Sequence, residues 1–243
     1  MQKYLCIDIG NTRWKAGIFD KKGLLSFHSF TSEEALEELS ALLYNHKPTF
    51  SIFSTVKAVD VSLCKLLEKH TTLLRFDHNT PLPIINKYQT PQTLGLDRLA
   101  AVMGVFGQHS NTLVIDAGTC ITYDLLIDQH TYIGGNISPG LDMRYKALNT
   151  FTDKLPRLSW KEQAEHYGKT TEEAIQNGVF RGLIHEIEGF INHFSNKYSP
   201  LTVILTGGDS KYLVESLKNK IFVRSNLVLD GLSKILIHNV NEN

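Results

Sequence analysis

The sequence predicts an α/β protein of two similar lobes, each a mixed β-sheet flanked by helices, with a cleft between them. The main observation is a repeated order. An apolar segment ends in Asp-x-Gly at residues 8–10 and again at 116–118, and strand-like, then helix-like segments follow each time. The length of 243 residues also suffices for two lobes of ordinary size. We therefore expect lobes at residues 1–107 and 108–243.

The first lobe opens with short apolar runs separated by turns, a pattern typical of strands. Strands are expected at Tyr4–Ile9, Trp14–Phe19 and Leu24–Phe30, the first two as a hairpin. Apolar residues at helical spacing predict a helix over Ser32–Leu43. The remaining expectations are strands at Phe50–Val56 and Leu73–Phe76, helices at Val61–Lys69 and Leu96–Phe106, and a loop over Thr80–Thr93.

The second lobe repeats this order. Strands are expected at Thr112–Ile115, Ile121–Ile127 and Thr131–Asn136. Few residues outside the turns are identical between the lobes, so the internal duplication is suggestive only. The later elements are helices at Leu141–Leu148, Thr171–Ile191 and Ser210–Lys218, and a strand at Leu201–Thr206.

Composition excludes several classes of function. Lys plus Arg equals Asp plus Glu at 25 each, so no strong field points to nucleic acid or a membrane surface. The three cysteines are widely spaced and form no CxxC pair, which argues against zinc and against a disulfide framework. No apolar stretch approaches the ~20 residues that span a bilayer, and the N-terminus shows no leader pattern. A cytoplasmic location is expected.

The first turn reads Asp-Ile-Gly-Asn-Thr at residues 8–12. Gly10 permits close approach of the backbone, and Asn11 and Thr12 can offer donors to phosphate oxygens. Asp8, at the end of a strand, is placed to hold Mg²⁺, which prefers one or two carboxylates together with waters and phosphates. An ordinary Asp-Gly hairpin turn would look the same, so this motif alone does not decide.

A second turn of the same kind, Asp-Ala-Gly-Thr at residues 116–119, follows the first strand of the second lobe. Two such loops can clasp a polyphosphate from both sides, and phosphoryl transfer depends mainly on positioning and charge neutralisation. The sequence has no GxxxxGK(S/T) loop, and no strand is followed by GxGxxG. P-loop and dinucleotide-binding folds therefore have no support.

Asp97 lies in Gly-Leu-Asp-Arg at residues 95–98, where an apolar helix begins. A carboxylate at a helix N-terminus is stabilised as the anion, so a structural role is one interpretation. The functional alternative is that Asp97 accepts the proton of an attacking hydroxyl, which is typically worth ~10²–10⁴ in rate.

Two glycine-rich stretches, at residues 134–140 and 206–209, each connect a strand to a helix. Each alone is a weak signal, but the order and spacing of all the motifs are specific. Together they resemble the type III pantothenate kinases over almost the whole chain. The motifs are Asp-x-Gly-Asn-Thr, Gly-x-Asp-Arg, Asp-x-Gly-Thr-x-x-Thr, Gly-Gly-x-Ile-x-Pro-Gly and Thr-Gly-Gly-Asp.

The resemblance implies a homodimer of chains with two actin-like, ribonuclease H-like lobes. It implies transfer of a phosphoryl group from ATP to the primary hydroxyl of pantothenate, the first step towards coenzyme A. Mg²⁺ with ATP and a monovalent cation, K⁺ or NH₄⁺, are the implied cofactors.

Carried over position by position, the resemblance gives Asp97 the role of general base, Asp8 that of Mg²⁺ ligand and Asp116 that of K⁺ or NH₄⁺ ligand. Thr170 stands beside Thr171, so which of the two hydroxyls reaches the substrate stays open. ATP and its phosphates are assigned to Asp8, Ile9, Gly10, Asn11, Thr12, Arg13, Trp14, Lys15 and Thr119. Pantothenate is assigned to Tyr88, Gly95, Leu96, Asp97, Arg98 and Thr171.

Two alternatives stay open. Another small-molecule kinase of the same superfamily, acting on a sugar or polyol, would share the turns but need a different acceptor pocket. A catalytically silent regulator could share the scaffold, but it would be free to lose Asp8, Asp97 or Asp116, and all three are present.

Overall fold

The computed structural model describes residues 2–55, 61–162 and 167–241. It divides into two compact units. The first unit comprises Met1–Gln108, Gln129–Ile133 and Asn226–Asn243, and the second comprises His109–Asp128 and Gly134–Ser225. This division differs from the expected one because the C-terminal helix and a short segment at 129–133 pack with the first unit. Within the described residues, no helix is long and apolar enough to cross a bilayer.

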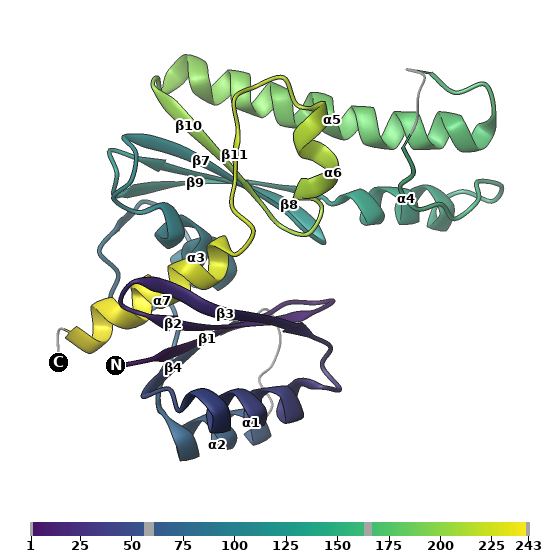
Figure 1. The fold of residues 1–243 in the computed structure, drawn as a ribbon. Helices are drawn as coiled ribbons and strands as arrows, with labels where there is room; N and C mark the ends of the chain where they lie inside the picture. Colours follow the sequence, from purple (N-terminus) through teal and green to yellow (C-terminus); the bar gives the residue numbers. More distant parts are fainter. Residues whose placement is uncertain (1, 56–60, 163–166, 242–243) are drawn as a thin grey trace. The chain divides into compact units, whose positions relative to one another are not determined.

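The first unit is built on a five-stranded mixed sheet (Figure 1). The strand order is β3-β2-β1-β4-β5, antiparallel on the β3 side of β1 and parallel on the β5 side. Asp20 closes the tight β2–β3 turn, since its Oδ1 accepts from the backbone N–H groups of Lys22 and Gly23 at 2.7 and 3.1 Å. The strands are β1 (Tyr4–Ile9), β2 (Trp14–Asp20), β3 (Gly23–Phe30), β4 (Phe50–Thr55) and β5 (Thr72–Arg75).

Helices cover both faces of this sheet (Figure 1). On one face, α1 (Ala35–His46) and α2 (Val61–His70) bury an apolar stripe against β1 and β2, and they also supply the crossovers that parallel strands need. On the other face lie α3 (Leu96–Val105) and α7 (Leu227–Asn241). Successive residues of β1 point to opposite faces, so Leu5 and Ile7 join the α1–α2 core while the Cys6 thiol bonds Ser233 of α7.

The crossing of α3 and α7 depends on two glycines. A Cβ at Gly231 would overlap the carbonyl oxygen of Ala100, and one at Gly104 would lie 2.7 Å from the carbonyl oxygen of Leu227. The Lys234 ammonium donates to the same turn of α3, to the Gly104 carbonyl oxygen at 3.0 Å. Backbone contact this close fixes α7 against α3, and through α3 it fixes the residues at the start of that helix.

The second unit repeats the topology of the first. Its strands follow the order β11-β10-β7-β8-β9, antiparallel between β7 and β8 and parallel among β7, β10 and β11. The short β6 (Ile85–Asn86) pairs with the first residues of β9, which belong to the first unit. The strands are β7 (Asn111–Ala117), β8 (Cys120–Ile127), β9 (Thr131–Pro139), β10 (Leu201–Thr206) and β11 (Phe222–Val223). The expected pair of lobes, each a mixed sheet flanked by helices, is confirmed.

The long α5 (Thr171–Lys197) packs against the sheet of the second unit and against α4 (Leu141–Thr150). Its start is fixed by a capping box: Thr170 Oγ1 accepts from the Glu173 N–H at 3.2 Å, and the Glu173 carboxylate accepts from the Thr170 N–H at 3.2 Å. A short α6 (Ser210–Leu213) follows β10 and continues as a 3₁₀ turn at Val214–Ser216.

Among the strands and α-helices of the described residues, three lie outside the expected set: α7, β6 and β11. The helix expected over Ser210–Lys218 is shorter, because the chain changes to a 3₁₀ turn after Leu213. A further 3₁₀ turn at Pro91–Thr93 falls inside the expected loop. Val56, the expected end of the fourth strand, lies outside the described residues.

Candidate active site

Asp8 lies next to the end of β1 in the first unit, between two polar neighbours. Its Cα pairs with Lys15 on β2 on one side and with Ser54 on β4 on the other. The Ser54 hydroxyl donates to Asp8 Oδ1 at 3.2 Å. The strand register therefore gives the carboxylate a positive charge and a hydroxyl as neighbours.

The pKa of the Asp8 carboxyl is raised above its ordinary value of 3.8. Burial is the largest cause, and the Lys15 ammonium opposes it. The negative charge of Asp97 adds to the rise, while the hydrogen bond from Ser54 lowers the pKa. Asp8 and Asp97 are thus close enough for their charges to act on each other, although they are remote in the sequence.

The turn after Asp8 has a tight backbone. A Cβ at Gly10 would lie 2.8 Å from the carbonyl oxygen of Arg13, so this position has no room for a side chain. Asn11 and Thr12 are exposed at the tip. Arg13 is held against β3, since its Nε donates to Ser29 Oγ at 2.9 Å and its Nη2 donates to the Ser29 carbonyl at 2.6 Å.

Ile9 and Trp14, which the sequence assigned to the phosphate loop, have apolar surroundings. The Ile9 side chain is buried in the α1–α2 core, and the Trp14 ring lies 6.5 Å from that of Phe30. Their side chains stabilise the strands that flank the turn. The polar side chains at this turn include Thr12, which is exposed, and Lys15, whose charge acts on Asp8.

Asp97 occupies the first turn of α3, two residues after the N-cap residue Gly95. Its Oδ1 accepts from the backbone N–H of Arg98 at 2.9 Å. A Cβ at Gly95 would overlap Asp97 Oδ1 and would lie 3.6 Å from the Arg98 side chain. Glycine at this position therefore lets both functional side chains fold back over the start of the helix.

Arg98 is nearly fully buried and faces an aromatic ring. Its guanidinium carbon lies 5.7 Å from the centroid of the Tyr88 ring, within the range of a cation–π contact. The Tyr88 N–H donates to Asn86 Oδ1 at 2.9 Å, which ties the segment after β6 into a turn. The structure thus brings Tyr88, Gly95, Asp97 and Arg98 together in the first unit.

Asp116 has the equivalent position in the second unit, near the end of β7. Its Cα pairs with Thr122 on β8 and with Thr206 on β10, as Asp8 pairs with Lys15 and Ser54. The turn that follows is closed by the Gly118 N–H, which donates to the Cys120 carbonyl at 3.0 Å. Thr119 lies exposed on that turn.

The two glycine-rich stretches that were weak signals in the sequence both converge on this turn. The Gly140 N–H donates to the Thr119 carbonyl at 3.1 Å, and the Asp209 N–H donates to the Ala117 carbonyl at 3.0 Å. Gly207 has φ of 93°, and a Cβ there would lie 2.5 Å from Asp116 Oδ1. Glycine therefore lets the chain pass directly beside the Asp116 carboxylate.

Thr171 lies on a groove of about 1000 Å³ in the second unit. Its neighbour Thr170 caps α5 and is not part of the lining, so of these two threonines Thr171 is the one at the groove. The lining is almost entirely apolar. It consists of Pro139, Met143, Arg144, Ala147, Leu148, Phe151, Thr152, Leu155, Thr171, Ala174, Ile175, Gly178 and Val179.

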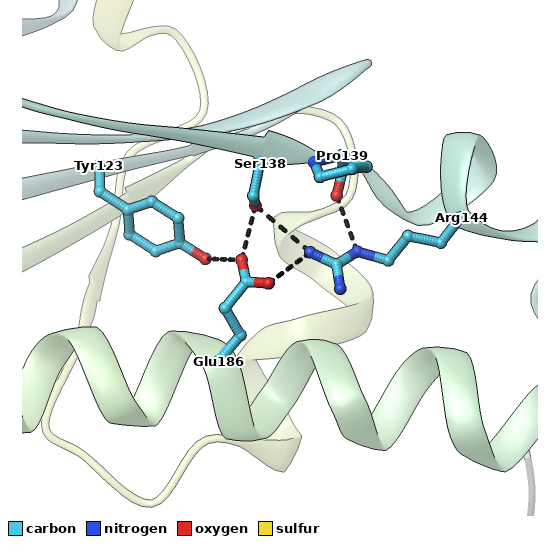
Figure 2. A network of polar contacts seen from close by, with 5 residues as sticks. All are labelled: Tyr123, Ser138, Pro139, Arg144 and Glu186. Carbon is cyan, nitrogen blue, oxygen red and sulfur yellow. Dashed lines mark hydrogen bonds and ion pairs between the residues drawn. The ribbon is translucent and has the colours of Figure 1, made fainter. Parts of the chain in front are cut away.

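One wall of this groove is fixed by a polar network centred on Glu186 of α5 (Figure 2). Tyr123 and Ser138 donate to Glu186 Oε1 at 2.8 and 2.5 Å, and Arg144 Nη2 donates to Oε2 at 2.6 Å. Arg144 Nε also donates to the Pro139 carbonyl at 2.8 Å. Burial opposes ionisation of Glu186, but the hydrogen bonds from Ser138, Arg144 and Tyr123 lower its pKa.

Sequence reasoning missed Ser54, Glu186 and the neighbours of Tyr88. Ser54 carried a usable signal, because a hydroxyl near the end of a strand parallel to β1 can reach a carboxylate near the end of β1. Glu186 carried none, since one more carboxylate on a polar helix face looks ordinary. Within the described residues, no group of three or more His, Cys, Asp or Glu side chains could hold a metal ion.

Solved structures of other proteins share this fold. A glucokinase of the ROK family from Streptomyces griseus, in complex with glucose and AMPPNP, superposes with a TM-score of 0.55 at 12% identity, over 97% of this chain and 99% of the other. A Campylobacter jejuni protein attributed to the Baf family of transcriptional activators gives 0.63 at 24% identity, over 98% and 99%. The fold is that of the actin-like ATPases and sugar kinases.

Sequence comparison gives the family. The type III pantothenate kinase profile matches residues 4–193. The type III pantothenate kinase of Phocaeicola vulgatus is 44% identical over 238 residues, which is 97% of this chain and 98% of the relative. That of Flavobacterium johnsoniae is 40% identical over 234 residues, 95% and 96% of the two chains. The chain belongs to the type III pantothenate kinase family, which confirms the resemblance seen in its motifs.

Proposed function

We propose that this protein transfers the γ-phosphoryl group of ATP to the primary hydroxyl of pantothenate, giving 4′-phosphopantothenate in the first step of coenzyme A biosynthesis. The observation that carries the proposal is the pair of interacting carboxylates, Asp8 and Asp97, in a chain 44% identical to a type III pantothenate kinase. One of them suits a metal-bound phosphate chain and the other suits an attacking hydroxyl. A kinase that uses ATP is expected in the cytoplasm.

The reaction follows from the roles of these groups. The hydroxyl oxygen of pantothenate attacks the γ-phosphorus while the bond from that phosphorus to the β–γ bridging oxygen breaks, and ADP leaves with the electron pair. Asp97 accepts the hydroxyl proton as general base. The turn at residues 10–12 and the Lys15 ammonium bind the phosphates, because phosphoryl transfer is accelerated mainly by positioning and charge neutralisation.

Asp8 is the residue proposed to hold Mg²⁺. Bound Mg²⁺ would neutralise charge on the phosphate oxygens. A single carboxylate suits this ion, which keeps several waters and takes phosphate oxygens as its other ligands. The raised pKa of Asp8 fits a carboxylate that gains from a nearby cation, because the cation would offset the burial that disfavours its charge.

Asp116 and Thr119 are proposed to serve the cation and nucleotide in the second unit. Asp116 would hold K⁺ or NH₄⁺, and Thr119 would contact ATP. The support is the crowding of backbone around this turn, since Gly207 and Gly140 pack directly against it. Carbonyl and carboxylate oxygens gathered in this way suit a monovalent cation.

Pantothenate is proposed to contact Tyr88, residues 95–98 and, from a second copy of the chain, Thr171. The groove that Thr171 lines would then form the face of a homodimer. Its apolar lining supports this assignment, as does Phe151, which is 84% exposed at the groove. An apolar surface of this kind is typical of a contact between subunits.

A substrate panel tests the proposal. Purified protein with Mg-ATP and K⁺ is given pantothenate or one of several hexoses, and ADP formation is measured. ADP formation is expected with pantothenate as the acceptor and not with any of the hexoses. A hexose preferred over pantothenate would establish the sugar kinase alternative that the solved structures with this fold suggest. No turnover of any substrate would favour a regulatory role, as attributed to the Campylobacter jejuni protein.

A further inference from the structure

Tyr132 is buried at the start of β9, and the site residues assigned above do not include it. Its ring stacks on that of Tyr88, with centroids 6.3 Å apart and planes 18° from parallel. Tyr88 in turn faces the Arg98 guanidinium at 5.7 Å. The three side chains therefore form a column that leads from the interior of the first unit to the residue after Asp97.

The backbone around Tyr132 holds the segment that carries Tyr88. The Ile85 N–H donates to the His130 carbonyl and the Lys87 N–H donates to the Tyr132 carbonyl, each at 2.8 Å. These bonds form the short parallel pairing of β6 with β9. In this pairing Ile85 lies opposite Thr131 and Asn86 lies opposite Tyr132, so β9 sets the position of the segment after β6.

We propose that Tyr132 is a positioning residue for the pantothenate site, whose ring orients Tyr88 and through it the Arg98 guanidinium. A stacked ring restricts the plane of Tyr88, and an oriented ring face restricts the guanidinium. An arginine held in one orientation loses less freedom when it binds an anionic substrate. This role rests on the proposed function, since Arg98 is there assigned to pantothenate.

Tyr4 offers a matched control. It is a buried tyrosine of the same unit, and its ring stacks on Phe50 at 6.2 Å with planes 22° from parallel. Its hydroxyl donates to Gln2, and no residue of the candidate site takes part in the stack. Removal of either ring should reduce stability, but only the loss of Tyr132 should affect the pantothenate site selectively.

The kinetic test compares Tyr132→Met, Tyr132→Phe and Tyr4→Met. Tyr132→Met is expected to raise KM for pantothenate about tenfold, while kcat and KM for ATP stay within about twofold of the wild type. Tyr132→Phe keeps the ring and should restore the wild-type KM. An equal effect of Tyr132→Met and Tyr4→Met on KM, or a loss confined to kcat, would overturn the proposal.

A second measurement does not depend on substrate. The ¹⁵Nε NMR signal of Arg98 is assigned as the one that disappears in Arg98→Lys. In the wild type this signal is expected to show a ring-current shift and slow rotation of the guanidinium. Both should disappear in Tyr132→Met and persist in Tyr132→Phe. If the Arg98 guanidinium of the wild type rotated freely and its ¹⁵Nε signal showed no ring-current shift, the proposed stacking of Tyr132, Tyr88 and Arg98 would be refuted. This outcome needs no folded variant. Wild-type inactivity with pantothenate would instead refute the proposed function and leave this readout intact.

Discussion

Asp97, in the first turn of α3, raises the pKa of Asp8 near the end of β1. Two acidic groups from distant parts of the chain therefore share one electrostatic environment. Burial of Asp8 is the larger cause of its raised pKa, and only Lys15 and Ser54 oppose it. Ionisation of Asp8 is therefore disfavoured in the unliganded protein, and such perturbed carboxyl groups cluster at functional sites.

Asp97→Asn should lower kcat by ~10²–10⁴, because the amide cannot accept the proton of the attacking hydroxyl. ATP affinity should change little. Steady-state kinetics and ATP titration measure the two quantities. Asp77→Asn, the same change in an exposed turn of the first unit, is the control and should retain full kcat. A fully active Asp97→Asn would remove this residue as the base.

Asp8→Asn should stabilise the unliganded protein at neutral pH while it abolishes activity. The folded-state pKa of Asp8 lies above its ordinary value of 3.8, so its contribution to stability is fully present below that value. The contribution is lost as pH rises through the folded-state pKa, because the buried carboxylate then carries a charge that burial disfavours. Thermal unfolding at several pH values measures the difference. A lower Tm of Asp8→Asn at neutral pH would contradict this.

The same coupling predicts how Asp97 affects metal binding. Loss of the Asp97 charge should lower the pKa of Asp8, so Asp97→Asn should keep its affinity for Mg-ATP to lower pH than the wild type. Titration calorimetry across the acidic range is the measurement. Identical pH profiles for the two proteins would show that the carboxylates do not act on each other.

Glu186→Gln should lower the free energy of unfolding by about 1–3 kcal/mol at pH 7, because it weakens the partner of Arg144, Ser138 and Tyr123. The pKa of Glu186 is lowered, so its contribution is present above the ordinary value of 4.5 and is lost as pH falls through the folded-state pKa. The difference in the free energy of unfolding between wild type and Glu186→Gln should therefore become smaller at acidic pH. Urea unfolding at two pH values measures it.

An exposed ion pair supplies the comparison for Glu186. The Arg144 and Glu186 side chains are 21% and 25% exposed, whereas those of Arg75 and Glu68 are 65% and 47% exposed. Solvent screens the second pair more strongly, so Glu68→Gln should have the smaller effect. Equal effects of the two substitutions would mean that the network in Figure 2 adds nothing beyond a surface contact.

Phe151→Glu should weaken the proposed homodimer by about 100-fold, since it places a charge on the apolar groove of the second unit. Sedimentation equilibrium gives the dissociation constant. Tyr44→Glu is the control, because Tyr44 is 79% exposed on α1 of the first unit and lies outside the groove. A monomeric wild type would contradict the proposed homodimer. A dimer whose dissociation constant is unchanged in Phe151→Glu would show that the subunits make contact at another surface.

The strands and most helices could be predicted because their apolar residues alternate or recur at helical spacing. The helix α7 could not, since Leu227, Leu232, Ile235 and Leu236 are all buried between α3 and the first sheet. A helix that is apolar on several faces lacks the periodicity that marks a surface helix. Its packing in the first unit depends on Gly104 and Gly231. The close approach of each glycine to the backbone of the facing helix is visible in the structure and not in the sequence.

The site was predictable where glycine and carboxylate motifs are local, as around Asp8 and Asp116. The backbone bonds that bring Gly140 and Asp209 to residues 117–119 join distant segments, so the sequence showed only separate turns. Tyr132 has no local signal, because a buried aromatic on a strand looks like core. Roles that arise from stacking between remote segments need the structure.

Product analysis tests the central claim most directly. Wild-type protein is incubated with Mg-ATP, K⁺ and pantothenate, and the products are separated and examined by mass spectrometry and ³¹P NMR. Formation of ADP together with a phosphomonoester at the primary hydroxyl of pantothenate is predicted. ADP without that ester, or unchanged pantothenate in a protein that phosphorylates another alcohol, would contradict the account.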